Sequence, residues 1–154
     1  MQIRPATTTD RTAILALMRP RDYNRIHLQP ICFLIAEEDA RVVGIGQIKR
    51  HWDGTPELAS LVVDETKRGQ GIGRALVRAL VAHHFAQHPA EVLYLFCLST
   101  LEHYYQPFGF QRAVRQELPW PLAVMHLAGN GIGQIADIIG HGFQVIAMKI
   151  AASK

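Results

Sequence analysis

Apolar and polar positions along the chain predict short strands on either side of a long central helix. Continuous or alternating apolar runs rich in β-favouring residues predict the strands. These runs cover residues 2–5, 32–37, 41–50, 58–63, 91–98, 110–116 and 143–150. Helical patterns begin after Thr8 or Thr9, continue from Ile72 toward His88, and return over residues 101–107. Because strands and helices are interspersed, we expect an α/β fold.

Two features of this pattern predict how the strands are arranged. The order strand 58–63, helix, strand 91–98 predicts a parallel pair, because a crossover helix returns the chain to the same end of the sheet. Gly44 and Gly46 lie inside the strand of residues 41–50, where glycines often mark a bulge or the close approach of another element. The polar residues between strands 32–37 and 41–50 predict a tight hairpin.

The most informative stretch is a glycine turn between the buried strand of residues 58–63 and the central helix. Its sequence is Lys67-Arg68-Gly69-Gln70-Gly71-Ile72-Gly73-Arg74. Glycines remove the side chains that would keep a ligand from the backbone, and the first amides of a helix carry a partial positive charge. A phosphate or diphosphate is therefore the expected ligand, with Lys67, Arg68 and Arg74 beside it to neutralise its charge.

Two segments of the chain resemble the GNAT-type N-acetyltransferases. Arg68-x-x-Gly71-x-Gly73 is similar to that family's signature for binding acyl-coenzyme A, and Tyr104-Tyr105-Gln106-Pro107-Phe108-Gly109-Phe110 is similar to its tyrosine and Gly-Phe segment. The resemblance covers residues 2–116 and returns at 143–150. It implies one domain over residues 1–154, with a mixed, largely antiparallel sheet, helices on both faces, and two central strands that splay apart where the acyl group lies.

The resemblance also implies an activity, the transfer of an acetyl group from acetyl-CoA to a primary amine within a ternary complex. Tyr105 would protonate the leaving thiolate and Glu57 would be the general base. The backbone amides of Leu61, Val62 and Val63 would bind the thioester and the pantetheine arm, and the turn 67–74 the diphosphate. Each side chain also has a structural interpretation: Glu57 is a solvated residue at a strand end, and Tyr105 is an aromatic at the edge of the core.

Composition limits the alternatives. At 154 residues with 49% hydrophobic and 19% charged residues, the chain has the size of one globular domain. A net charge of +3 is too small, and too concentrated at the glycine turn, to indicate nucleic-acid binding. Cys32 and Cys97 lie in apolar runs, which suits free thiols and a cytoplasmic location. We expect no membrane segment, because no apolar run reaches the roughly 18 residues needed.

Several histidines and a second glycine-rich segment are further candidates for chemistry. His84 and His88 are four residues apart on one helix, but no further ligand joins them, so we predict no metal site. His51 and His103 are candidates near the acceptor side, as auxiliary bases or without a role. The segment from Gly129 to Gly133 is interpreted as a turn, because no clear strand precedes it and no basic residue follows closely.

The acceptor side is the part that the sequence defines least. Residues 21–30, 51–56 and 118–142 would line it, the first containing a polar connection or short helix and the last a further helix near Ile135, Ile138 and Ile139. These segments lack a dense acidic cluster, so small-molecule and peptide amines both remain open. The alternative function keeps the fold without catalysis: a coenzyme A sensor or interaction module that uses residues 118–142 to bind a partner or a second copy of itself.

Overall fold

The computed structural model describes residues 1–18, 28–129 and 144–151, with the backbone alone for residues 126–129. These residues form two compact units. The first unit comprises Met1–Lys49 and Leu58–Pro89, and the second comprises Arg50–Glu57 and Ala90–Lys154. The single domain over residues 1–154 stays a prediction.

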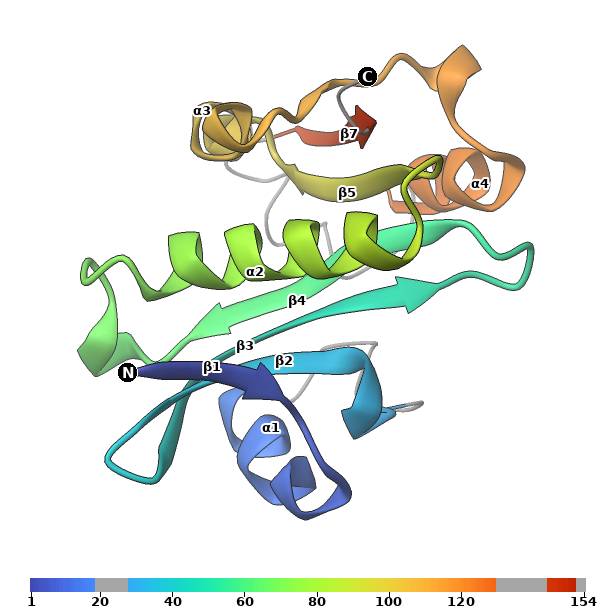
Figure 1. The fold of residues 1–154 in the computed structure, drawn as a ribbon. Coiled ribbons are helices and arrows are strands. Elements are labelled where there is room, and N and C mark those ends of the chain that lie inside the picture. The colour runs from blue at the N-terminus through green and yellow to red at the C-terminus, as the bar shows by residue number, and fades with distance from the viewer. Residues whose placement is uncertain (19–27, 130–143, 152–154) are drawn as a thin grey trace. The chain divides into compact units, whose positions relative to one another are not determined.

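The strands of the first unit are β1 (Gln2–Pro5), β2 (Phe33–Glu38), β3 (Arg41–Arg50) and β4 (Pro56–Val63), with the ends of β3 and β4 reaching into the second unit (Figure 1). They neighbour one another in chain order, and the pairs β1–β2 and β2–β3 are antiparallel. The turn between β2 and β3 has two residues, Asp39 and Ala40, with φ of 49° and 58°. Positive φ at both positions matches the twist of a two-residue hairpin, so the predicted hairpin is confirmed.

Helix α2 (Ile72–Gln87) packs against the first unit's sheet where β3 carries its two glycines (Figure 1). A Cβ on Gly44 would lie 3.0 Å from Ile72 Cγ2, and one on Gly46 would lie 2.8 Å from Leu80 Cδ1. Both distances are shorter than ordinary carbon contacts. The predicted close approach at these glycines is confirmed.

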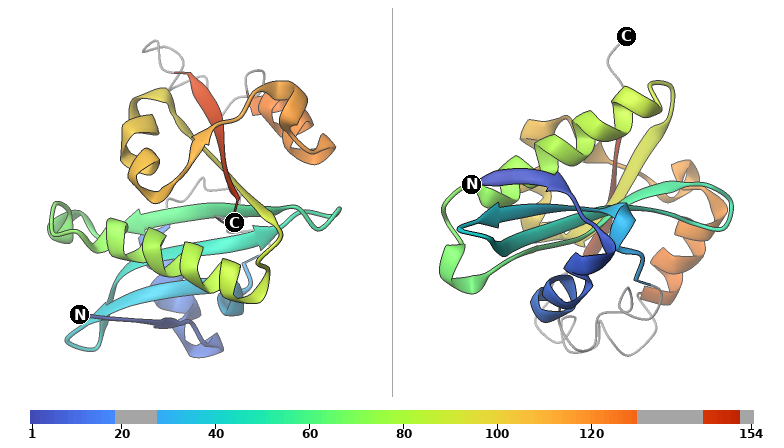
Figure 2. Two further views of the ribbon diagram at one scale, coloured as in Figure 1. Left: turned by 45° about the horizontal axis from the view of Figure 1, so that its top comes forward. Right: turned by 60° about the horizontal axis from the view of Figure 1, so that its bottom comes forward.

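The opposite face of this sheet is covered by α1 (Arg11–Leu17), so the first unit has a helix on each face (Figure 2). Side chains of α1 and of the strands form one buried apolar cluster. Its members are Ala6, Ile14, Met18, Leu28, Phe33, Ile35 and Ile45. Complete burial of one such large side chain stabilises the fold by roughly 1.5–3 kcal/mol, so this cluster is a major part of what holds α1 in place.

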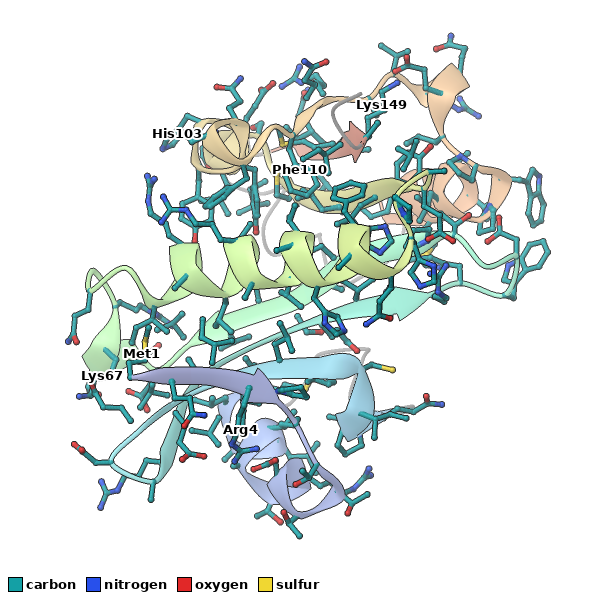
Figure 3. All side chains as sticks on the ribbon, viewed as in Figure 1. Met1, Arg4, Lys67, His103, Phe110 and Lys149 are labelled. Carbon is teal, nitrogen blue, oxygen red and sulfur yellow. The ribbon has the colours of Figure 1, made fainter. Side chains whose placement is uncertain are left out.

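The start of α1 differs from the prediction that Thr8 or Thr9 caps it. The chain first forms a 3-10 turn, η1 (Thr8–Asp10), and α1 begins at Arg11. Asp10 Oδ2 accepts hydrogen bonds from the Thr7 amide at 2.7 Å and the Thr7 hydroxyl at 2.9 Å. The cap is therefore formed by Asp10 and Thr7. Arg4 extends from β1 to this turn and pairs with Asp10 at 2.8 Å and with Glu37 at 2.6 Å (Figure 3).

The second unit contains β5 (Val92–Leu98), β7 (Val145–Ala151) and β6 (Gln111–Arg112), which lie in that order and are all antiparallel. Its helices are α3 (Glu102–Tyr105) and α4 (Trp120–Gly129). The predicted helix 101–107 is divided, because α3 lies between the 3-10 turns η5 (Ser99–Leu101) and η6 (Gln106–Phe108). Gly109, with φ of 93°, follows η6 and ends the helical segment, as Gly commonly does.

The predicted strand 110–116 is wrong beyond its first residues. After β6 the chain turns into a 3-10 helix, η7 (Arg115–Glu117), in which Glu117 Oε2 accepts a hydrogen bond from the Val114 amide at 3.0 Å. Ala113 and Leu118, on either side of η7, pack with Leu122 and Ala147 in one cluster. Tertiary packing and a local cap therefore replace the strand.

Three predicted features of the loops lie outside the described residues. They are most of the polar connection 21–29, the glycine-rich turn after Gly129, and the helix near Ile135, Ile138 and Ile139.

Candidate active site

The glycine turn begins where β4 ends. A short 3-10 turn, η4 (Glu65–Lys67), is capped by Asp64, whose Oδ1 accepts hydrogen bonds from the Thr66 amide at 2.9 Å and the Thr66 hydroxyl at 2.6 Å. Gly69 and Gly71 then have φ of 79° and 82°. L-residues rarely adopt this left-handed conformation, which is why glycine occupies both positions.

These two glycines bring the chain into α2 with the helix amides at an open surface. The first hydrogen bond of the helix is donated by the Ala75 amide to Gly71 O at 3.0 Å, so the amides of residues 72–74 precede the internal helical series. A Cβ built on Gly69 or on Gly71 would meet no atom within 4 Å. The turn therefore has open space beside it, and a side chain at either glycine would occupy that space.

The basic residues of the turn make contacts of their own within the first unit. Lys67 Nζ donates to Glu38 of β2, and this hydrogen bond raises the pKa of Lys67 and lowers that of Glu38. Arg68 donates from Nε to Val63 O at 3.3 Å and lies 3.3 Å from Glu65. Figure 3 labels Lys67 at the turn between β4 and α2. Of the three predicted phosphate-neutralising residues, two are thus held by nearby acceptors.

β4 contains a backbone irregularity just before the three residues predicted to bind the thioester arm. Ser60 has φ of 52°, in the left-handed region, although it is neither a glycine nor in a turn. Its hydroxyl accepts a hydrogen bond from the buried Gln47 of β3 at 3.0 Å. Such a residue redirects the groups that follow it, here Leu61, Val62 and Val63, which are half-buried.

In the second unit, Tyr105 is the last residue of α3 and is 7% exposed. Its ring makes edge-to-face contacts with Tyr104 and Phe110, at centroid distances of 5.0 and 6.0 Å. Burial raises the pKa of Tyr105 above its usual range, and the neighbouring Cys97 acts in the same direction. The phenol is therefore held in its protonated, hydrogen-donating form. The same ring contacts are expected if Tyr105 is only a packed aromatic residue of the core.

Glu57 is not the solvated strand-end residue of the structural interpretation. Its side chain is 7% exposed, and Oε2 lies 2.6 Å from His51 Nε2, whose side chain is 10% exposed. Both residues belong to the second unit. Sequence reasoning named both residues separately and missed the pair. The signal was a six-residue spacing across a compact turn, which brings two strand ends together.

The remaining predicted features are distributed between the units. Arg68, Gly71 and Leu61–Val63 belong to the first unit, and Glu57 and Tyr105 to the second. Cys32 and Cys97 are free thiols. Across the described ranges 1–18, 28–129 and 144–151, no three His, Cys, Asp or Glu side chains are grouped as metal ligands. In these same ranges no helix has the length and apolar character needed to cross a membrane.

Comparisons with known proteins identify the class. A model of the acetyltransferase (GNAT) domain matches residues 29–112, which is more than half of the chain. The protein belongs to the GNAT acetyltransferase family, and the predicted family membership is confirmed. An uncharacterized N-acetyltransferase of Methanocaldococcus jannaschii is 41% identical over 58 residues, which cover 38% of this chain and 36% of that protein.

Solved structures show the same fold. The N-acetylglutamate synthase of Neisseria gonorrhoeae, complexed with coenzyme A and N-acetyl-glutamate, matches with a TM-score of 0.73 and 20% identity over 99% of this chain and 35% of that one. The ribosomal-protein-S18-alanine N-acetyltransferase of Escherichia coli matches with a TM-score of 0.67 and 19% identity over 99% and 94% of the two chains. The match spans about a third of the length of the M. jannaschii and N. gonorrhoeae relatives. The predicted GNAT-like α/β fold is confirmed.

Proposed function

We propose that this protein is an N-acetyltransferase that transfers an acetyl group from acetyl-CoA to a primary amine. The observation that carries the proposal is the left-handed turn at Gly69 and Gly71, which opens α2 onto free space. Family membership supports it, as does the coenzyme A in the N. gonorrhoeae relative. Coenzyme A supplies the acetyl thioester, and its diphosphate suits backbone amides and nearby cations.

The residues of this chain fit such a ligand. The amides from Gly69 to Arg74 would hold the diphosphate, with Arg68 and Arg74 beside it. The main chain of Leu61, Val62 and Val63, directed by the irregularity at Ser60, would align the pantetheine arm. A Cβ at Gly71 would fill the space that the diphosphate needs. No metal takes part in this proposal.

The reaction needs a base for the amine and an acid for the departing sulfur. The amine nitrogen forms a bond to the thioester carbonyl carbon, and the carbon–sulfur bond breaks. The proton leaving the nitrogen goes to a base that includes Glu57, and Tyr105 donates a proton to the thiolate. Tyr105 carries its phenolic proton at neutral pH, which the second role requires.

Thiol release tests the proposal directly. Wild-type protein would be incubated with acetyl-CoA and, separately, L-glutamate, L-lysine, spermidine and a peptide with an N-terminal alanine. The first and last probes follow the activities named for the two structural relatives. Acceptor-dependent release of free coenzyme A, with the acetylated product seen by mass spectrometry, is the expected result. Binding of acetyl-CoA in calorimetry without any release would favour the non-catalytic sensor instead.

The proposal also includes a cellular location and an oligomeric state. A cytoplasmic location is supported by the free thiols of Cys32 and Cys97, since reducing compartments preserve thiols. A homodimer is supported by the exposed apolar side chains of Trp120, Val124 and Met125 on α4. Light scattering of the purified protein tests the homodimer, and a mass equal to one chain would contradict it.

A further inference from the structure

The contact between His51 and Glu57 lies beside a hydrogen-bonded turn of the second unit. The His51 amide donates to Thr55 O, and the Gly54 amide donates to His51 O, both at 2.9 Å. These bonds close the turn between β3 and β4 and bring His51, which follows β3, close to Glu57 near the start of β4. The imidazole and the carboxylate are thereby positioned before any substrate binds.

Side chains around the turn contribute further hydrogen bonds and an ion pair. Asp53 accepts hydrogen bonds from the Thr55 amide at 2.9 Å and the Thr55 hydroxyl at 2.8 Å. Arg50 donates to Gly54 O at 2.8 Å and pairs with Glu91 at 2.9 Å. The charged groups of the second unit around His51 are therefore Glu57, Asp53 and, one residue before it, Arg50 with its partner Glu91.

The orientation of the ring assigns different tasks to its two nitrogens. Because Nε2 faces Glu57 Oε2 at 2.6 Å, Nδ1 is the nitrogen that remains for another molecule. A carboxylate bonded to one ring nitrogen holds the proton there and leaves the other nitrogen as a proton acceptor. It also stabilises the imidazolium that forms when the ring takes up a proton. Oε2 of Glu57 is therefore engaged by His51, and the ring presents its second nitrogen on the other side of this bond.

We propose that His51, through Nδ1, is the group that takes the proton from the acceptor amine, and that Glu57 is the positioning residue that orients it. This inference rests on the proposed acetyl transfer. The amine nitrogen loses a proton to Nδ1 as its bond to the carbonyl carbon forms, while Nε2–H continues to donate to Glu57. The proton then leaves the imidazolium to solvent, which restores the neutral ring for the next cycle.

The decisive variant is His51→Gln. The side-chain amide nitrogen of glutamine takes a position similar to that of Nε2, so it retains a donor toward Glu57 while it removes the base. If the contact between His51 and Glu57 only stabilises the turn, His51→Gln keeps its activity. If His51 is the base, kcat falls by about 10²-fold or more, as is typical when a general base is lost. Affinity for coenzyme A, measured by calorimetry, stays within about threefold in either case, which is less than 1 kcal/mol.

Two additional measurements distinguish a catalytic role from a structural one. The acid limb of kcat/KM in the wild type disappears in His51→Gln. His51→Ala regains part of its activity when free imidazole is added. His83→Gln, an exposed histidine on α2 bonded to Gln87, is the matched control and behaves like the wild type.

The results separate failure of this inference from failure of the proposed function. A wild-type protein that releases thiol, together with a His51→Gln variant within threefold of its kcat, would overturn the inference alone and assign the base to Glu57. A wild-type protein that binds acetyl-CoA without thiol release on any of the four acceptor probes would remove both. A third outcome would also overturn the inference about His51. In that outcome His51→Gln loses activity but keeps the acid limb, and imidazole does not restore activity to His51→Ala.

Discussion

Lys67 of the glycine turn is hydrogen-bonded to Glu38, the last residue of β2, so a carboxylate lies beside the proposed diphosphate site. The pKa of Glu38 is lowered by this hydrogen bond, and its charge therefore persists at neutral pH. Coenzyme A bound at the turn would compete with Glu38 for Lys67. We therefore expect Glu38 to weaken the binding of coenzyme A at the turn.

The first prediction follows from this competition. Glu38→Gln should tighten coenzyme A binding by about threefold to tenfold, because it removes a negative charge and releases Lys67. Calorimetry at low and high salt checks it, with the gain shrinking as salt screens the charges. Glu117→Gln, which removes the carboxylate paired with Lys149 in the second unit, should leave the affinity unchanged. Weaker binding in Glu38→Gln would mean that Glu38 positions Lys67 for the ligand.

The second prediction concerns the left-handed glycines. Gly71→Ala should lower the free energy of unfolding by about 1 kcal/mol, because a Cβ is strained at a φ of 82°, and should weaken coenzyme A binding at least tenfold. Gly54→Ala is the matched control, with a φ of 87° and equally open surroundings. It should lose similar stability but retain coenzyme A affinity. Urea denaturation and calorimetry measure the two effects, and equal affinities in both variants would contradict a ligand site at the turn.

The third prediction tests Tyr105. Tyr105→Phe should lower kcat by about 10²-fold or more with little change in acetyl-CoA affinity, because the phenyl ring keeps the packing and loses the proton. Tyr104→Phe, the neighbouring substitution on α3, should have a small effect. Stopped assays of thiol release measure kcat, and calorimetry measures the affinity for acetyl-CoA. Unchanged turnover in Tyr105→Phe would remove Tyr105 from the mechanism.

The raised pKa of Tyr105 also determines how stability depends on alkaline pH. The unfolded chain loses the phenolic proton near pH 10, before the folded protein does, so the folded state is favoured in full below that pH. Stability contributed by this residue should therefore fall as the pH rises above about 10. In Tyr105→Phe this part of the alkaline loss should be absent, which urea denaturation between pH 8 and pH 11 would reveal.

The fourth prediction concerns acid stability of the first unit. Hydrogen bonds from Arg4, and then from the Thr7 amide, lower the pKa of Asp10 well below its usual range. Asp10 therefore adds stability that is complete above its ordinary pKa of about 4 and is lost as the pH falls toward the folded-state value. Asp10→Asn should be less stable at pH 7 and should show a shallower loss of stability below pH 4. Asp39→Asn, at the exposed β2–β3 turn, is the control, and an equal acid slope in wild type and Asp10→Asn would contradict this role.

Much of the fold was predictable because its signals are local. The two-residue hairpin at Asp39 and Ala40, the glycine turn before Ile72 and the long helix after it each follow from residues close in sequence. The strand predicted at 110–116 failed for the opposite reason, since η7 depends on the packing of Leu118 with Leu122 and Ala147. No property of residues 113–116 alone reports that packing.

The same distinction between local and tertiary signals applies to the candidate site. The turn around Gly71 could be found from sequence, because glycine adopts its backbone angles more readily than other residues do. The contact between His51 and Glu57 could not, because it depends on how tightly the intervening turn closes. The hydrogen bond between Lys67 and Glu38 was also missed, because the two residues are far apart in sequence and only the folded chain brings them together.

The two glycines of β3 determine how closely α2 rests on the sheet. Because α2 begins at the proposed diphosphate site, we expect its close packing on Gly44 and Gly46 to influence where the first amides of the helix lie relative to the sheet. Residues that never touch a ligand can in this way tune how well the ligand fits.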